Sequence, residues 1–208
     1  MRWGMRRFER TDPVRDDGAG PGLPELADLL EERDPELSAH GLRVAEHAEA
    51  IARAMGLPAP AIGRVRVAAR LHDLGKVWIS RDILDKPGPL TEREWVEIRR
   101  HPRTAANLLQ SVDLHDLADI VGAHHERPDA AGYPDAVCSD ARPLEAQIIA
   151  VADAYDAMLS SRPYAPARTP EEARGELSRV ASSQFDEYVV DAFLRVLDGS
   201  GEGRRAAV

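Results

Sequence analysis

Apolar side chains recur every three to four residues along most of the chain, which is the spacing of one face of an α-helix. Leu26, Leu29 and Leu30 begin this pattern, and no segment alternates apolar and polar residues as a half-buried strand does. We therefore predict an all-α fold, a single bundle of about seven to eight helices within residues 23–198. The expected helices begin at about 23 and then cover about 35–55, 59–74, 91–101, 114–125, 144–159, 170–181 and 187–197.

Capping residues set the expected ends of these helices. Thr91 with Glu94 has the spacing of a capping box, and Thr169 precedes a proline at the first helical position. Gly56 ends the second helix, and Asp186 caps the last one. We expect flexible tails at residues 1–22 and 199–208, and the longer loops at 76–90 and 127–143, where prolines and glycines gather.

Composition limits the class of protein. The 208 residues are 43% hydrophobic and 30% charged, as in a globular domain, and the net charge is −9. An acidic protein is a poor ligand for nucleic acid or for an anionic membrane surface, so neither partner is expected. The one cysteine, Cys138, cannot form an internal disulfide, and no apolar run reaches the roughly 20 residues of a membrane span. We expect a cytoplasmic protein.

Histidines and carboxylates stand beside the most apolar segments. His72 and Asp73 follow an apolar helix, His124 and His125 end another, and Asp153 lies inside the apolar run 148–152. Burying such groups is costly unless a cation binds them. Imidazoles mixed with carboxylates suit Fe, Mn, Ni or Zn, and the absence of thiolates favours octahedral Fe or Mn.

A site of this composition suits phosphoryl chemistry. Two metal ions that share a carboxylate can activate a hydroxide and neutralise the charge that develops on an attacked phosphate. Such a centre would also let an acidic chain bind an anionic substrate.

The order of these residues resembles the signature of the HD phosphohydrolase superfamily, and longer stretches resemble its HD-GYP branch, bacterial phosphodiesterases of cyclic di-GMP. The similar stretches are HDLGKVWISRDILDKPGPLTEREW (72–95), RRHPRTAANLL (99–109), HHERPDAAGYPD (124–135), PLEAQIIAVADAYDAMLSSRPY (143–164) and SSQFDEYVVDAFL (182–194). The resemblance implies two or three divalent metal ions, most often Fe or Mn. It places their ligands on His72, Asp73, His101, His124, His125 and Asp153, with His40 as the first histidine of the pattern and Glu36 as a ligand of a third ion.

The resemblance also assigns roles to other positions. Asp73 would bridge two metals, and Lys76 would act as a catalytic residue at the scissile phosphate. Arg162 and the Gly132-Tyr133-Pro134 element would contact substrate, and Asp156, on nearly the same helix face as Asp153, would orient a ligand. His47 and His115 match no ligand and are interpreted as helix-surface residues.

Two departures from the family pattern affect the expected substrate. Ala130 replaces a usual glycine, which would strain the loop if that position needs a positive φ, and Ala165 replaces a basic residue. The primary hypothesis is hydrolysis of cyclic di-GMP to pGpG, with further cleavage to GMP left open. The alternatives are hydrolysis of another cyclic dinucleotide or nucleotide phosphoester, and a non-catalytic module that senses nucleotide. Docking of a diguanylate cyclase through the GYP loop is a further expectation.

Overall fold

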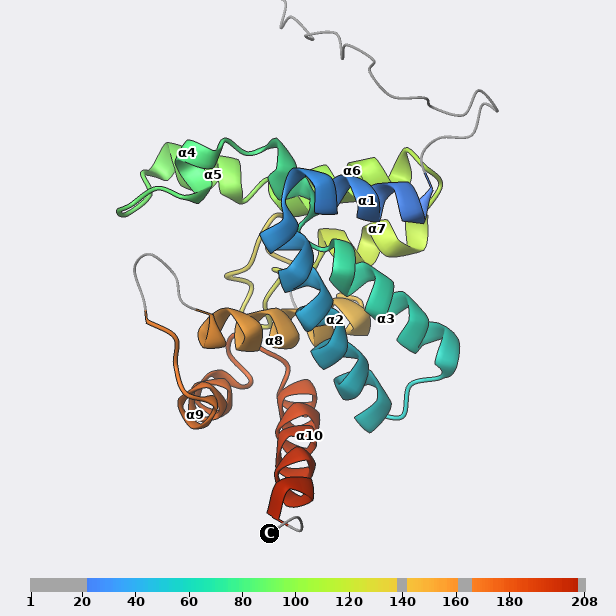
Figure 1. Cartoon of the computed structure of the whole chain (residues 1–208), viewed down its shortest axis with the longest axis vertical. Helices are drawn as coiled ribbons and strands as arrows, with labels where there is room; N and C mark the ends of the chain where they lie inside the picture. The colour runs from blue at the N-terminus through green and yellow to red at the C-terminus, as the bar shows by residue number, and fades with distance from the viewer. Residues whose placement is uncertain (1–21, 138–141, 161–165, 206–208) are drawn as a thin grey trace, which may run out of the picture.

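The computed structural model describes residues 22–137, 142–160 and 166–205, with side chains as far as Gly199. The predicted all-α class is confirmed: within these residues the chain is helical, and an isolated bridge between Ala181 and Phe185 is the one strand-like pairing. The helices (Figure 1) are α1 (Leu23–Arg33), α2 (Pro35–Ala54), α3 (Ala59–Leu71), α4 (Arg81–Leu84), α5 (Glu92–Ile98), α6 (His101–Gln110), α7 (His115–Gly122), α8 (Leu144–Leu159), α9 (Pro170–Val180) and α10 (Glu187–Arg205), with a 3-10 helix, η1 (Leu74–Trp78).

The second helix lies at the centre of the fold. α2 packs against α3, α8, α10 and α1, and its residues Val44, Ala48 and Ile51 are fully buried. Gly41 allows α2 and α3 to pack closely, because a Cβ at this position would come 2.6 Å from the carbonyl oxygen of Arg70 on α3. This contact packs α2 against the end of α3 that precedes His72.

The capping signals correctly located the ends of several helices. The hydroxyls of Thr91 and Thr169 accept from the backbone N–H groups of Glu94 and Glu172, and both sites are complete capping boxes. The carboxylate of Asp186 accepts from the backbone of the first turn of α10, as predicted.

Three regions differ from the expectation. Residues 101–110 form a separate helix, α6, with Pro102 in its first turn, whereas the sequence analysis ended a helix at 101 and expected no further helix before 114. The predicted loop 76–90 contains most of η1 and all of α4, elements too short for a periodic pattern to reveal. In Figure 1, α4 and α5 project away from the other helices. The last helix runs to Arg205, beyond residue 198, where the folded region was predicted to end. Of the predicted N-terminal tail, residues 1–21 lie outside the described residues.

No helix in the described part of the chain combines the length and the apolar character that crossing a membrane requires.

Candidate metal centre

Three histidines stand at the ends of helices and point into one buried space. His72 follows α3, His101 begins α6, and His124 comes shortly after α7; each side chain is at most 1% exposed. In each ring Nδ1 lies 2.6–2.7 Å from a backbone carbonyl three residues earlier. A carbonyl only accepts, so Nδ1 carries the proton and Nε2 keeps its lone pair for the interior. The three acceptors are the carbonyls of Ala69, Ile98 and Val121.

Asp73 lies among these rings. Its Oδ2 is 3.4 Å from Nε2 of His72, and its Oδ1 is 3.2 Å from Nε2 of His101. Lys76 donates to Oδ2 across 2.6 Å. Gly75 makes the arrangement possible, because a Cβ there would overlap the backbone carbonyl of His101.

The donor set fits a cation. Nε2 of His101 and Nε2 of His124 lie 3.3 Å apart, and both carry lone pairs because their protons are on Nδ1. Nε2 of His72 and Oδ1 of Asp73 are buried without a hydrogen-bond partner. Unpaired buried polar atoms are costly, and bound metal ions would satisfy them.

The potential ligand atoms form two groups that share Asp73. One group is Asp73, His101, His124 and His125, and the other is His40, His72 and Asp73; within each, the ligand atoms lie within 4.8 Å of one another. A carboxylate common to both groups would be a ligand of two ions if each group holds one.

His40 reaches the centre from the face of α2. Its Nε2 lies 3.1 Å from Oδ1 of Asp153, on α8, and its Nδ1 donates across 2.7 Å to Asp156, one helical turn further. Asp156 also receives two hydrogen bonds, of 2.7 and 2.9 Å, from the guanidinium of Arg43. The expected contact of Asp156 with a candidate ligand is present, and Arg43 is a partner that sequence reasoning missed.

The two histidine environments shift pKa values in opposite directions. Burial lowers the pKa of His125 to about 3 and that of His124 well below its usual range, where the neighbouring imidazoles add to the effect. Burial also acts on His40, but its hydrogen bonds to Asp153 and Asp156 outweigh it and raise the pKa to about 9.

The carboxylates remain ionised. Burial alone would raise the pKa of Asp73 and of Asp153, but the adjacent imidazoles, and Lys76 beside Asp73, hold both values well below the usual range. The centre therefore offers the anionic oxygens of Asp73 and Asp153 and the neutral nitrogens of His124 and His125 to an ion.

The GYP loop closes one side of the centre. The ring of Tyr133 lies over His125, with centroids 4.6 Å apart. Gly132 passes so close to the preceding chain that a Cβ would come 2.5 Å from the carbonyl oxygen of His125. Ala130, the departure from the family pattern, has a φ of +56°, the left-handed conformation that the sequence analysis named as the condition for strain at this position.

Glu126 anchors this loop, a role that sequence reasoning did not assign. Its buried carboxylate accepts from the backbone N–H groups of Asp135 (2.7 Å) and Val137 (2.8 Å). The available signal was its position directly after His125 in a loop rich in turn residues.

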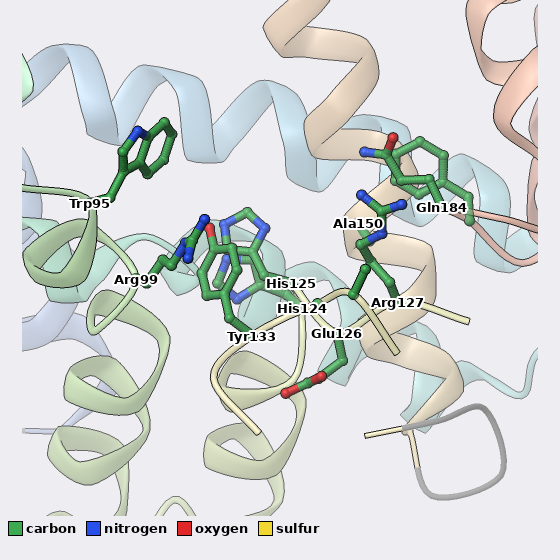
Figure 2. Close-up of a pocket in the computed structure, with 12 residues that line it drawn as sticks. Trp95, Arg99, His124, His125, Glu126, Arg127, Tyr133, Ala150 and Gln184 are labelled. Atoms are coloured by element: carbon green, nitrogen blue, oxygen red, sulfur yellow. The ribbon is translucent and has the colours of Figure 1, made fainter. Parts of the chain in front are cut away.

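A pocket of about 370 Å³ opens beside the centre (Figure 2). His124 and His125 line it, and Tyr133, Arg99 and Trp95 lie together on one side of it in Figure 2. Arg127, Gln184 and Phe185 line it as well. A substrate held at the imidazoles would extend into this space.

Some predicted residues are not brought together. Glu36 is exposed and belongs to neither group of ligand atoms, although it lies one turn from His40. Arg162 and Ala165 lie outside the described residues. His115 is exposed, but the surface assignment of His47 was wrong: it is half-buried, edge-on to Tyr155 and Phe193, because α2 packs on α8 and α10 there.

Comparisons with known proteins place this centre in a family. A family model described as HD domain matches residues 24–189. The chain is 43% identical over 176 residues to the cyclic di-GMP phosphodiesterase response regulator RpfG of Xanthomonas campestris, a match covering 83% of this chain and 47% of that protein. It is 34% identical over 176 residues to the 3'3'-cGAMP-specific phosphodiesterase 2 of Vibrio cholerae, covering 83% of this chain and 34% of the relative.

A solved structure supports the fold. A HDG"Y"P protein from Bdellovibrio bacteriovorus superposes with a TM-score of 0.67 at 19% identity, covering 79% of this chain and 53% of that one. The chain spans about half or less of the length of the two relatives compared above. The resemblance found in the sequence is confirmed, and the chain belongs to the HD-domain family.

Proposed function

We propose that this chain is a metal-dependent phosphodiesterase that hydrolyses cyclic di-GMP to pGpG; chromatography of the products tests whether cleavage continues to GMP. The observation that carries the proposal is the pair of ligand groups around Asp73, where Nε2 of His72 and Oδ1 of Asp73 are buried without a hydrogen-bond partner among the described residues. The similarity to a cyclic di-GMP phosphodiesterase at 43% identity supports the substrate class.

Each residue has a task in this proposal. Asp73 would hold two ions, with His101, His124 and His125 on one side and His40, His72 and Asp153 on the other. Bound divalent ions would supply Lewis-acid charge at the phosphate and lower the pKa of water. Lys76, 2.6 Å from Asp73, would hold positive charge beside the phosphate, where it can protonate the leaving oxygen.

The identity and number of the ions belong to the proposal too. Imidazole and carboxylate ligands without thiolate suit Fe or Mn. A third ion would need Glu36, whose side chain must then turn inward from its exposed position beside α2. Elemental analysis of protein loaded with Fe or Mn gives the count.

One alternative substrate has support of its own. The relative named as 3'3'-cGAMP-specific shares 34% identity, and Ala130 alters the loop that carries Tyr133. A panel of cyclic dinucleotides at equal concentration separates the two.

The complete donor set argues against a purely nucleotide-sensing module. Docking of a diguanylate cyclase on the GYP loop, contacts of Arg162 with substrate, and a cytoplasmic location remain predictions.

The decisive test is Asp73→Ala. We expect the variant to bind no metal at stoichiometric levels and to lose turnover of cyclic di-GMP, because both groups of ligands lose their common oxygen donor. The measurements are elemental analysis and chromatography of the nucleotide products, with the exposed Glu31→Ala on α1 as the matched control. Metal-loaded wild-type protein that leaves cyclic di-GMP intact would refute the proposal.

A further inference from the structure

Two arginines line the pocket beside the metal centre, and their environments differ. The guanidinium of Arg127 makes a two-pronged contact with Asp129, at 2.9 and 2.5 Å, so its charge and its donors are occupied. The guanidinium of Arg99 lies 5.5 Å from the ring centroid of Trp95 and 6.0 Å from that of Tyr133. Among the residues that the structure describes, no carboxylate lies within ion-pair distance of Arg99.

Arg99 also has a defined place relative to the centre. Tyr133 stacks on His125, Arg99 lies beyond Tyr133, and Trp95 lies beyond Arg99, so the side chains form a row leading outward from the imidazoles (Figure 2). Trp95 is 39% exposed although its ring is large and apolar. A nucleotide whose phosphate is bound at the imidazoles has room to place its base along this row.

On the basis of the proposed function, we propose that Trp95 and Arg99 form the binding site for a guanine base of the substrate, and that Arg99 selects guanine over adenine. The flat indole is a stacking surface that accepts any base. The guanidinium is a planar fork of donors, and guanine presents two acceptors, O6 and N7, at matching spacing. Adenine presents one acceptor and one donor on the same edge, so the fork cannot be satisfied.

The test compares cyclic di-GMP with cyclic di-AMP on the full chain. Arg99→Met keeps the length and the apolar stem but removes the donors, and Arg99→Lys keeps the charge but removes the fork. Equilibrium binding is measured by calorimetry on chelator-treated protein, and kcat/KM is measured on manganese-loaded protein. Arg100→Ala is the matched control, because that neighbouring arginine is exposed and pairs with Glu97.

We expect Arg99→Met and Arg99→Lys to weaken binding of cyclic di-GMP by about 5- to 150-fold while changing binding of cyclic di-AMP much less. Trp95→Ala should weaken both ligands by similar factors and preserve their ratio, because stacking does not read base identity. Arg100→Ala should leave both unchanged.

Equal losses for the two dinucleotides in Arg99→Met, or full recovery in Arg99→Lys, would overturn the proposal, since either result indicates a contact with phosphate charge. If manganese-loaded wild-type protein turns over neither dinucleotide, the proposed function fails. The calorimetric comparison still decides the role of Arg99 in that case.

Discussion

The candidate centre has two halves that hold their histidines in different ways. In the helix-end half (His72, His101 and His124), each Nδ1 donates to a backbone carbonyl three residues earlier. In the helix-face half (His40 with Asp153 and Asp156), Nδ1 of the histidine donates to a carboxylate that Arg43 also binds. A carbonyl orients a ring without adding charge, whereas carboxylates favour the protonated imidazole.

This difference has a consequence for metal binding. His124 and His125 are neutral at pH 7 and are ready to accept an ion. His40, with a pKa of about 9, holds a proton that an ion must displace. The ion held by His101, His124 and His125 should therefore bind with little dependence on pH above neutrality, and the ion held by His40 and His72 should bind better as the pH rises towards 9.

The largest expected effect is on the stability of the metal-free protein as the pH changes. Because the pKa of His40 is higher in the folded state, its contribution of about 3 kcal/mol is complete below about pH 6.5 and is lost as the pH rises through 9. His125 acts in the opposite sense, because burial lowers its pKa in the folded state. The free energy of unfolding is therefore not reduced by His125 above about pH 6.5, and it falls as the pH drops towards 3. Urea unfolding from pH 4 to 10 in chelator checks both slopes.

His40→Gln separates the two halves in that experiment. The alkaline loss of stability should disappear in this variant while the acid loss remains. An unchanged alkaline slope would show that the carboxylates around His40 do not hold its proton.

The next effect concerns the carboxylate behind His40. Asp156→Ala removes the acceptor of Nδ1 and frees Arg43, and we expect metal affinity to fall by about 10- to 100-fold for the ion held by His40. Competition with a fluorescent chelator measures the affinity. Ile98→Val is the control from the helix-end half, because the acceptor there is a backbone carbonyl that a side-chain substitution leaves in place. Equal losses in the two variants would remove the distinction between the halves.

His125 belongs to neither half, and Glu126 extends the comparison to it. Among the described residues, no carbonyl or carboxylate forms a hydrogen bond with the ring of His125. Tyr133 stacks on this ring, and Glu126 anchors the loop that carries Tyr133. Glu126→Gln leaves one acceptor and turns an amide donor towards a buried backbone N–H, so we expect a loss of about 1–3 kcal/mol in the free energy of unfolding. Denaturant titration measures it, with the exposed Glu97→Gln as control, for which a change under about 1 kcal/mol is expected. If Glu126→Gln lowers the free energy of unfolding no more than Glu97→Gln does, the hydrogen bonds of Glu126 do not stabilise the loop.

The sequence predicted part of this arrangement because several candidate ligands occur where apolar helices end. His72 and His124 follow such helices, the resemblance to the family placed His101, and the capping boxes at Thr91 and Thr169 fixed the helix starts. The residues that were missed act across long distances in the chain. Arg43 meets Asp156 from another helix, and Glu126 meets the amide of Val137 over a loop, so neither contact leaves a local periodic signal.

The smallest expected effect tests a position that the sequence did reveal. Ala130 adopts a φ of +56°, where a Cβ costs roughly 1–2 kcal/mol, whereas glycine enters this region freely at some entropic cost to folding. Ala130→Gly should therefore raise the free energy of unfolding by about 1 kcal/mol. Ala131→Gly, at the next residue and without a positive φ, should lower it by about 0.5–1 kcal/mol. If both substitutions destabilise the protein alike, the loop that carries Tyr133 is not strained at residue 130, and the departure from the family glycine has no conformational cost.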